Sequence, residues 1–439
     1  MHIMGKLVWL ILGLDYILLP MAYAKSIPLF FIMLILSVGL AMYRATTISQ
    51  KVFQLYIWSF SFFGLSIFGV KLFDWVALIS LLYIILARKK IFINMNFLYL
   101  VPFYFYITIQ CIVLIMQNYE YENNVILELV RYILAILTGF VFSQLSLKNA
   151  ESKKWLDNFS ILVILQAIIM YVLQTRYAVN VSSNLKYISI QLFSDNNESR
   201  ISAFFSDPNK MMTFFFVLLF IRLVLILNDK HKIQWTNSFF IYLVGAVLSL
   251  SRTSVISVVL FLSGYVLYRV IFKNSSSLAT FSVLVVGIIF LVMISYFKAE
   301  LLHVGNVFFD YVLQLFGRTR TVMIDSSLAT DSRVEVWKDA YIYIKQSPIF
   351  GNGLLSEESL LPIPTHNTVI QLLLDTGILG LLLYFVGVLL PIFKRTPSWI
   401  AITLLIIPML FLDLANFRLI FVLLGIILQR KAKESTVEG

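Results

Sequence analysis

The side chains in this sequence that could carry out chemistry are mostly cations. They include five arginines that lie outside the long apolar segments or at their ends: Arg200, Arg252, Arg318, Arg320 and Arg333. A guanidinium group stays charged at any physiological pH and binds phosphate oxygens through two parallel hydrogen bonds. Arginines that converge on one surface therefore suit a pyrophosphate group as their ligand.

A second kind of candidate is His366, one of four histidines, at the start of the stretch THNTVIQLLLDTGILG over residues 365–380. The ordinary pKa of histidine lies near neutral pH, which suits a general base. Both kinds of candidate also have a structural interpretation. An arginine at a span end commonly extends to lipid phosphates. A histidine at a helix start is often an interfacial residue, and Asn367 could itself cap the helix.

Other kinds of site find no support in the motifs. The histidines are scattered and the chain has one cysteine, so the sequence shows no metal-ligand spacing. The turn at 351–353 lacks the GK[ST] ending of a phosphate loop, and the sequence contains no nucleophile elbow. We therefore expect no metal and no cofactor. The net charge of +11 follows membrane topology, so it does not indicate binding to nucleic acid.

The elements that must position these residues are apolar helices. The chain is 60% hydrophobic and 13% charged, and its mean hydropathy is +0.89. Apolar runs that can cross about 30 Å of hydrocarbon recur from end to end. We expect spans near 7–24, 27–43, 52–70, 72–87, 97–116, 126–146, 158–175, 211–228, 236–250, 253–270, 279–297, 367–393, 398–412 and 415–429. The sequence thus predicts an all-α fold, a polytopic bundle of about 12–14 transmembrane helices.

Basic residues mark alternate connections between these spans. The richer connections and the tail hold Arg44, Lys51, Arg88, Lys89, Lys90, Lys148, Lys153, Lys154, Lys230, Lys232, Arg269, Lys273, Lys394, Arg395, Arg430, Lys431 and Lys433. The opposite connections are poorer, with Lys25, Lys71 and an acidic stretch at 118–124. Because cytoplasmic loops are enriched in lysine and arginine, we expect both termini in the cytoplasm.

Two connections on the extracytoplasmic side, 176–210 and 298–366, are much longer than the others. Long loops in compact folds are usually functional. They divide the chain into N-terminal spans (1–175), a central region that begins with the first loop (176–297), the second loop (298–366), and C-terminal spans with a tail (367–439). In the second loop, the spacing of Val334, Trp337, Tyr341 and Ile344 predicts an amphipathic helix over 332–346.

Charged residues inside apolar segments are expected to pair. Glu128 and Arg131 are three residues apart, so they share a helix face and should form an intramembrane ion pair. Asp413 and Arg418, near the last hairpin, are expected to pair in the same way. Cys111 lies inside a span and is expected to be a buried thiol.

Four short motifs follow one another in the second half of the chain. RISAFFSDPN (200–209) places an arginine before an Asp-Pro-Asn turn, and LSLSRTS (248–254) places a serine–arginine break between spans. SRVEVWKDAYIYIKQSPIFGNGL (332–354) contains an Arg, Trp, Pro and Gly-x-Gly pattern, and the histidine and asparagine at 366–367 are followed by Gly377-x-x-Gly380. In their residues and their order, these motifs resemble those of the O-antigen polymerase and O-antigen ligase superfamily of bacterial surface-polysaccharide enzymes. The resemblance covers about residues 200–390.

The resemblance implies a glycosyltransferase that needs no metal. It would move a glycan from undecaprenyl pyrophosphate to an acceptor hydroxyl at the periplasmic face of the bacterial inner membrane. His366 would act as the base or orient the acceptor, and Arg200 and Arg252 would hold the pyrophosphate as part of the catalytic set. The implied substrate-binding residues are Arg333, Asn367, Arg318, Arg320, Asn209 and Trp337. The glycine pair would let the helix after His366 pack closely against a neighbour.

We expect the polymerase reaction, which joins lipid-linked repeat units into O-antigen or capsular polysaccharide. One alternative is the ligase reaction, which transfers the finished polymer to lipid A-core. An alternative from another class is a flippase for lipid-linked oligosaccharides, although a transporter should concentrate its charges near the bilayer midplane. The expected partners are the lipid-linked glycan and the bilayer, together with a chain-length regulator and a flippase.

Overall fold

The computed structural model describes residues 2–43, 45–87, 95–117, 122–147, 149–177, 183–185, 188–190, 201–228, 237–249, 251–272 and 326–429. Its helices are α1 (His2–Lys25), α2 (Ile27–Met42), α3 (Ile48–Phe60), α4 (Leu72–Ala87), α5 (Val101–Met116), α6 (Glu122–Gln144), α7 (Asn149–Tyr177), α8 (Pro208–Asn228), α9 (Asn237–Val247), α10 (Arg252–Phe272), α13 (Ser326–Gln346), α14 (Ser356–Leu360), α15 (Thr368–Tyr384), α16 (Leu390–Arg395), α17 (Ser398–Ala401), α18 (Ile407–Phe411) and α19 (Arg418–Ile427). Its strands are β1 (Leu65–Ile67), β2 (Val70–Lys71), β3 (Ser183–Leu185) and β4 (Ile188–Ile190). A 3-10 helix (Met95–Leu100) precedes α5, and π-helical turns (Phe385–Leu389 and Ile402–Ile406) join α15 to α16 and α17 to α18.

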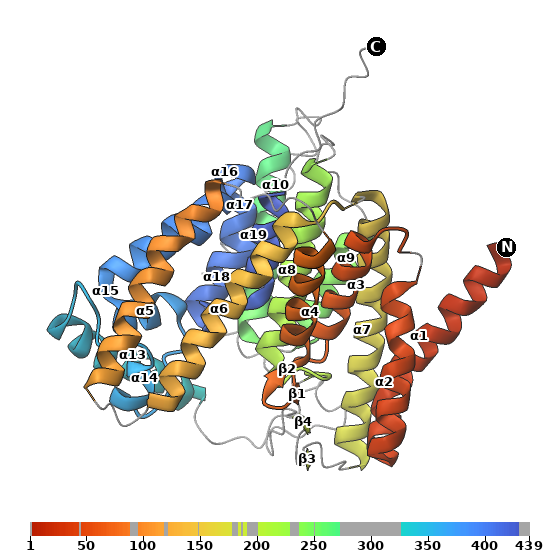
Figure 1. Ribbon diagram of the computed structural model, residues 1–439, viewed down its shortest axis with the longest axis horizontal. Helices are drawn as coiled ribbons and strands as arrows, with labels where there is room; N and C mark the ends of the chain where they lie inside the picture. The colour runs from red at the N-terminus through yellow and green to blue at the C-terminus, as the bar shows by residue number, and fades with distance from the viewer. Residues whose placement is uncertain are drawn as a thin grey trace, which may run out of the picture.

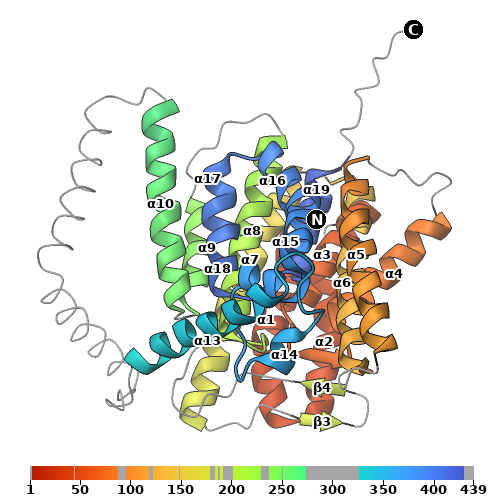
Figure 2. The ribbon, with the colours of Figure 1, turned by 90° about the vertical axis from the view of Figure 1, so that its left-hand side faces the viewer.

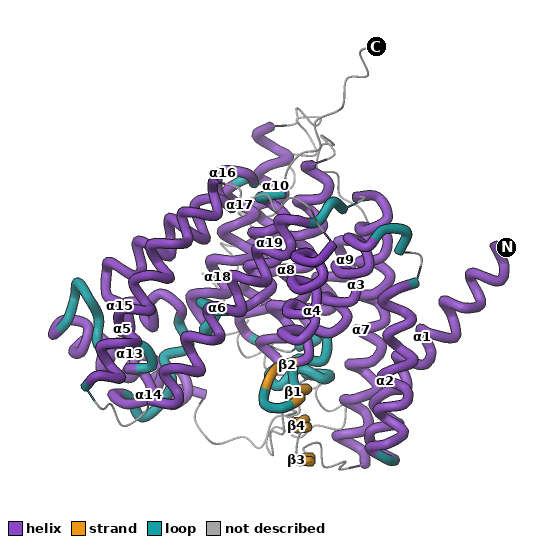
Figure 3. The backbone as a smooth tube through the Cα atoms, viewed as in Figure 1, coloured by secondary structure: helices purple, strands orange, loops and turns teal. Residues whose placement is uncertain are grey.

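The helices form a bundle whose two ends differ (Figures 1 and 2). In both views the strands, α13 and α14 lie at the lower end, and α16 and α17 lie at the upper end. Figure 3 shows that the strands are confined to the lower end, which we call the sheet end. Six helical segments among the described residues are long and apolar enough to cross a membrane, and five shorter apolar helices accompany them. The predicted all-α, multi-pass membrane architecture is therefore confirmed.

Helix α8 lies at the centre of the bundle, packed against α7, α9 and α19. Its sequence is apolar on every side, as expected of a helix that is buried all round. The charged Arg222 within it is buried and pairs with Asp157 of α7, with 2.6 Å between Nε and Oδ1. Tyr242 of α9 donates to the same carboxylate oxygen at 2.7 Å. This buried cluster joins three neighbouring helices through one carboxylate.

The predicted span 52–70 is wrong at its second half. Helix α3 ends at Phe60, and the chain then turns into the hairpin of β1 and β2. Phe68 and Gly69 adopt φ of 53° and 76°, so the turn needs two residues in the left-handed region, where glycine is favoured. Strand β1 also pairs with β4, giving an antiparallel sheet of order β2-β1-β4-β3. Long-range pairing of such short strands leaves no clear signal in an apolar sequence.

The helix predicted in the second outer loop is present as α13. Val336 and Ala340 of α13 pack in a small core with Leu361 and Leu374. Tyr341, which belongs to the predicted apolar face, is 56% exposed and has the Lys345 ammonium over its ring at 4.5 Å. The side chain of Ala340 is small and its residue is fully buried, so α13 approaches α15 closely along this line. The buried stripe therefore follows small side chains rather than the largest ones.

Part of the predicted organisation lies outside the described residues. This applies to the span at 279–297, to loop residues 298–325, and to Arg200, Arg318 and Arg320. The span count and the domain boundaries therefore stay predictions. Of the remaining C-terminal spans, 367–393 corresponds to α15 and the segments that follow it, and 398–412 to α17 and α18. The gap between the predicted spans 398–412 and 415–429 lies within the segment that separates α18 from α19.

Candidate functional site

His366 lies at the sheet end, directly before α15, and its residue is exposed. Its backbone adopts φ 48°, a left-handed conformation that costs a residue other than glycine about 1–2 kcal/mol. Such a conformation persists only where neighbouring contacts hold it. Asn367 supplies one of these contacts as the helix cap, because its Oδ1 accepts from the N–H groups of Val369 at 3.0 Å and Ile370 at 3.1 Å. The structural interpretation of Asn367 as a cap is confirmed.

The residue before the histidine is held from two other elements. The indole N–H of Trp337, in α13, donates to the Thr365 carbonyl at 2.8 Å. The Thr365 N–H donates to the carboxylate of Glu357, in α14. Trp337 was predicted from the resemblance to bind substrate. Its N–H holds the loop that carries His366, and its substrate-binding role stays a prediction.

The residue after the cap is joined to the segment between α18 and α19. Thr368 Oγ1 donates to the Leu412 carbonyl at 2.6 Å, and the Leu414 N–H donates back to the same hydroxyl at 2.9 Å. Asp413 lies between these two contacts and keeps access to solvent. The protein that surrounds its carboxyl, and next the negative charge of Glu128, raise the pKa of Asp413 to about 6. A second titratable group thus lies beside the start of α15.

Helix α15 is broken at Gly377. Gly377 adopts φ 63° and ψ −171°, a conformation that is essentially restricted to glycine. The carbonyls of Leu374 and Asp375 accept from the N–H groups of Asn352 and Gly353 at 2.8 and 2.9 Å. The N–H groups freed on the other side of the break, those of residues 378 and 379, donate to the carbonyls of 348 and 349 at 2.9 and 3.2 Å. The 348–353 turn therefore replaces the missing helical hydrogen bonds.

This arrangement corrects the predicted role of one of the two glycines in α15. Gly380 does meet a neighbouring helix, since a Cβ there would lie 3.2 Å from the Tyr106 ring of α5. Gly377 breaks the helix instead, and a Cβ there would lie 2.3 Å from the carbonyl oxygen of Ile349. The hydroxyl of Tyr106 donates to the carbonyls of Phe350 at 2.7 Å and Thr376 at 3.0 Å, which covers the break from the side of α5.

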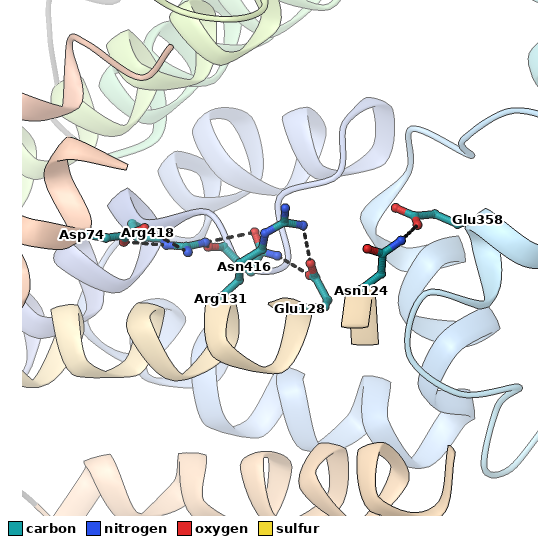
Figure 4. Close-up of polar contacts among 7 residues, drawn as sticks. All are labelled: Asp74, Asn124, Glu128, Arg131, Glu358, Asn416 and Arg418. Atoms are coloured by element: carbon teal, nitrogen blue, oxygen red, sulfur yellow. Dashed lines mark hydrogen bonds and ion pairs between the residues drawn. The ribbon is translucent and has the colours of Figure 1, made fainter. Parts of the chain in front are cut away.

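A chain of polar contacts holds the segment before α19, as Figure 4 shows. Arg418 binds Asp74 of α4 through two nitrogens, at 3.1 and 3.3 Å, and donates to the Asn416 carbonyl at 3.0 Å. Asn416 donates to Glu128, which also pairs with Arg131 at 2.8 Å. The expected pair of Glu128 and Arg131 is confirmed. The expected pairing of Arg418 with Asp413 is wrong, because the guanidinium faces Asp74 in the neighbouring helix.

Lys71 and Lys210, which were not predicted to be site residues, lie together. The ammonium groups of Lys210 and Lys71 lie 4.6 and 5.5 Å from the centre of the Phe63 ring. Burial, and then the positive charge of Lys210, lower the pKa of Lys71 to about 8, and Asp74 offsets this only in part. Neither ammonium forms an ion pair with a described carboxylate. Lys210 directly follows the Asp-Pro-Asn turn, and Lys71 lies in a connection that is poor in basic residues. These two positions were the available sequence signal.

The first two family-like motifs also meet. The hydroxyl of Ser251 donates to Asn209 Oδ1 at 2.7 Å, and the Asn209 N–H donates to Asp207 Oδ1 at 2.7 Å. Arg252 begins α10 directly after this contact. Lys210, the residue after Asn209, acts electrostatically on Asp413 beside the His366 helix. Arg333 lies in α13, whose other residues contact the His366 loop; the structure describes no more than the backbone of Arg252 and Arg333.

The structure thus brings His366, Asn367 and Trp337 together, and separately brings Asn209 to the start of α10. In the described part of the chain, no three histidine, cysteine, aspartate or glutamate side chains group in a way that could hold a metal ion. Cys111 is a free, buried thiol, as expected. Comparison with known proteins gives one finding: residues 238–385 match the O-antigen ligase family model. The match extends over α9, α10, α13, α14 and α15, and it includes His366 and the broken helix. No curated protein matches the chain.

Proposed function

We infer from its O-antigen ligase domain, residues 238–385, that this multi-pass membrane protein belongs to the O-antigen polymerase and ligase superfamily. We propose that it is a glycosyltransferase that joins undecaprenyl-pyrophosphate-linked repeat units into O-antigen or capsular polysaccharide. In this proposal the sheet end faces the periplasm, and both termini lie in the cytoplasm. The positive-inside distribution of lysine and arginine supports that orientation.

The observation that carries the proposal is the placement of His366. His366 is exposed, and hydrogen bonds hold the backbone on both sides of it. A base that abstracts a proton from a substrate must be both accessible and fixed. In the proposed reaction, His366 accepts the proton of an acceptor hydroxyl as its oxygen attacks the anomeric carbon. The bond from that carbon to the pyrophosphate oxygen breaks, and the lipid pyrophosphate leaves with the bonding electrons.

The leaving pyrophosphate gains negative charge, which fixed cations can stabilise. Lys71 and Lys210 supply two ammonium groups on one aromatic ring, and the repulsion between them favours an anionic ligand. Arg252 and Arg200 are proposed to complete the cationic set, because the Asn209–Ser251 contact brings the start of α10 to the residue before Lys210. Arg333, Arg318 and Arg320 remain proposed substrate-binding residues in the second loop.

We expect Lys71→Ala and Lys210→Ala each to lower the rate of glycan transfer by about 10–100-fold, the range for loss of a hydrogen bond to a charged group. Lys71→Arg should retain more activity than Lys71→Ala. Because Lys71 carries its charge only below a pKa of about 8, activity should fall as the pH rises through that value. The arginine variant should stay active to higher pH, since guanidinium does not titrate there.

The matched control is Lys25→Ala, which removes an exposed lysine from another connection of the same predicted side. Transfer is measured with purified protein and a synthetic lipid-pyrophosphate-linked oligosaccharide, by counting the repeat units in the product. Equal rates of glycan transfer for the Lys71, Lys210 and Lys25 variants would show that Lys71 and Lys210 are not part of the site.

The ligase reaction is a second candidate, because the matched family model is described as an O-antigen ligase. Deletion of the gene in its host separates the possibilities. A polymerase deletion should leave single repeat units on the surface lipid. A ligase deletion should abolish polymer on lipid A-core while lipid-linked polymer is still made. Lipid-linked single units that accumulate at the cytoplasmic face would instead indicate a flippase and overturn the proposal of an enzyme.

A further inference from the structure

Glu357 is a buried carboxylate that the proposed transfer step does not use. It lies in the short helix α14 and is 7% exposed. Its carboxylate accepts the N–H of Thr365, the residue before His366. The carbonyl of Thr365 is occupied too, by the Trp337 indole at 2.8 Å. Side chains from two separate elements thus hold both backbone polar groups of one residue.

This double contact lies where the backbone most needs support. His366 has φ 48°, and Asn367 and Thr368 fix the chain on its other side through the helix cap and the contact to Leu412. Without a contact at Thr365, only the carboxyl side of His366 would be held. The carboxylate of Glu357 therefore completes a clamp around the strained residue, formed by Glu357 and Trp337 on one side and Asn367 on the other.

The groups that face Glu357 are mostly acidic. Asp413 from the segment before α19 and Glu358 from its own helix both oppose its negative charge, and Asp375 of α15 lies near enough to interact with it. The hydroxyl of Ser356 is used by Asp375, at 2.7 Å, and is not available to Glu357. Burial raises the pKa of Glu357 to about 7. The negative charges of Asp413 and Glu358 add to this shift, and the hydrogen bond from Thr365 opposes it. The carboxyl therefore changes charge in the pH range where a histidine base operates.

We propose that Glu357 is a positioning residue, whose ionised carboxylate holds the Thr365 N–H and so fixes the His366 imidazole for the acceptor hydroxyl. The ionised form is the stronger acceptor, because charge-assisted hydrogen bonds are about twice as strong as neutral ones. When Glu357 is protonated, the clamp loosens and His366 samples unproductive positions. The inference rests on the proposed role of His366 in glycan transfer.

The test compares Glu357→Gln, which keeps an acceptor oxygen of the same shape without the charge, with Glu358→Gln as the matched control. Glu358 is the next residue of α14, is exposed, and contacts Asn124 at 3.5 Å. We expect Glu357→Gln to lower kcat about fivefold to tenfold with KM unchanged, the loss of roughly half of a charge-assisted bond. The decline of kcat from pH 8 to pH 5.5 should be less steep than in the wild type, because residue 357 no longer titrates. Glu358→Gln should keep the wild-type kcat and move the decline only slightly to lower pH, because it removes a minor contribution to the raised pKa of Glu357.

A second measurement does not depend on transfer. With His2, His231 and His303 replaced by glutamine, the rate at which diethyl pyrocarbonate modifies His366 reports its ionisation and surroundings. We expect the profile of this rate against pH to change in Glu357→Gln and not in Glu358→Gln. Identical modification profiles and identical kcat profiles in both variants would overturn the inference. Absence of transfer in the wild type, with a modification profile that still depends on Glu357, would instead refute the proposed function and retain the contact between Glu357 and the His366 loop.

Discussion

His366→Ala is expected to lower glycan transfer by about 10²–10⁴-fold, the usual contribution of a positioned acid or base. The protein should still insert and purify as the wild type does, because the residue is exposed and the helix cap is supplied by its neighbour Asn367. The physical reason is that the imidazole of His366 is an exposed base with an ordinary pKa near neutrality, on a backbone that is fixed on both sides. Transfer is measured by the product assay with the lipid-linked oligosaccharide, beside a thermal unfolding curve in detergent.

Two further variants separate chemistry from backbone effects. His366→Asn removes the base but suits the backbone, since asparagine tolerates positive φ. It should be as inactive as the alanine variant and at least as stable. Asn367→Ser keeps a helix cap and changes the adjacent side chain, so it should retain most of the activity. Full activity in His366→Asn would refute the role of the imidazole, and inactivity of a stable Asn367→Ser would give Asn367 a direct role in the reaction.

Gly377→Ala is expected to prevent the accumulation of folded protein. The added methyl group would lie 2.3 Å from the Ile349 carbonyl oxygen and 2.6 Å from the Gly351 nitrogen, both of which are backbone atoms that cannot move independently. Gly351 is equally constrained, because a Cβ there would lie 2.4 Å from the Asp375 carbonyl oxygen. Steric strain and the unfavourable φ together should cost about 3–5 kcal/mol, a large part of the stability of an ordinary domain.

The matched control for this variant is Gly69→Ala. Gly69 has φ 76°, close to the 63° of Gly377, but a Cβ there would meet nothing within 4 Å. It should therefore show only the cost of the backbone conformation, about 1–2 kcal/mol. The comparison is made by the yield of monodisperse protein in detergent and by the midpoint of thermal unfolding. If both variants unfold at the same temperature, the contact between the 348–353 turn and the broken helix contributes little.

Several local features could be predicted because they depend on neighbours in the sequence. Glu128 and Arg131 pair because a helix brings residues three apart onto one face. Asn367 caps α15 because its side chain needs only the next two or three N–H groups. The helix over 332–346 was predicted from the spacing of its apolar residues, and α13 covers it. Which residues of that helix are buried depends on Ala340 and on its partner α15, and the sequence of the helix alone does not specify it.

Other features depend on residues far apart in the chain. Arg418 was expected to pair with Asp413, five positions away, but pairs with Asp74 because α4 lies beside the start of α19. Gly377 looked like a packing residue, and only the turn at 348–353 shows why the helix breaks there. Lys71 and Lys210 are separated in the sequence by the four helices α4, α5, α6 and α7, and they meet over Phe63 because the hairpin of β1 and β2 turns toward the start of α8. No local sequence pattern predicts that these two lysines lie together.

The sequence by itself determined that this chain is a bundle of apolar helices, because long uncharged runs in a bilayer must satisfy their backbone hydrogen bonds within each helix. It also singled out His366 and the glycines around it, through their types and spacing. The tertiary structure alone decided what holds that histidine: the indole of Trp337, the carboxylate of Glu357 and the segment before α19. Those contacts join elements that are distant in sequence, and their geometry is fixed by how the helices pack rather than by what each helix contains.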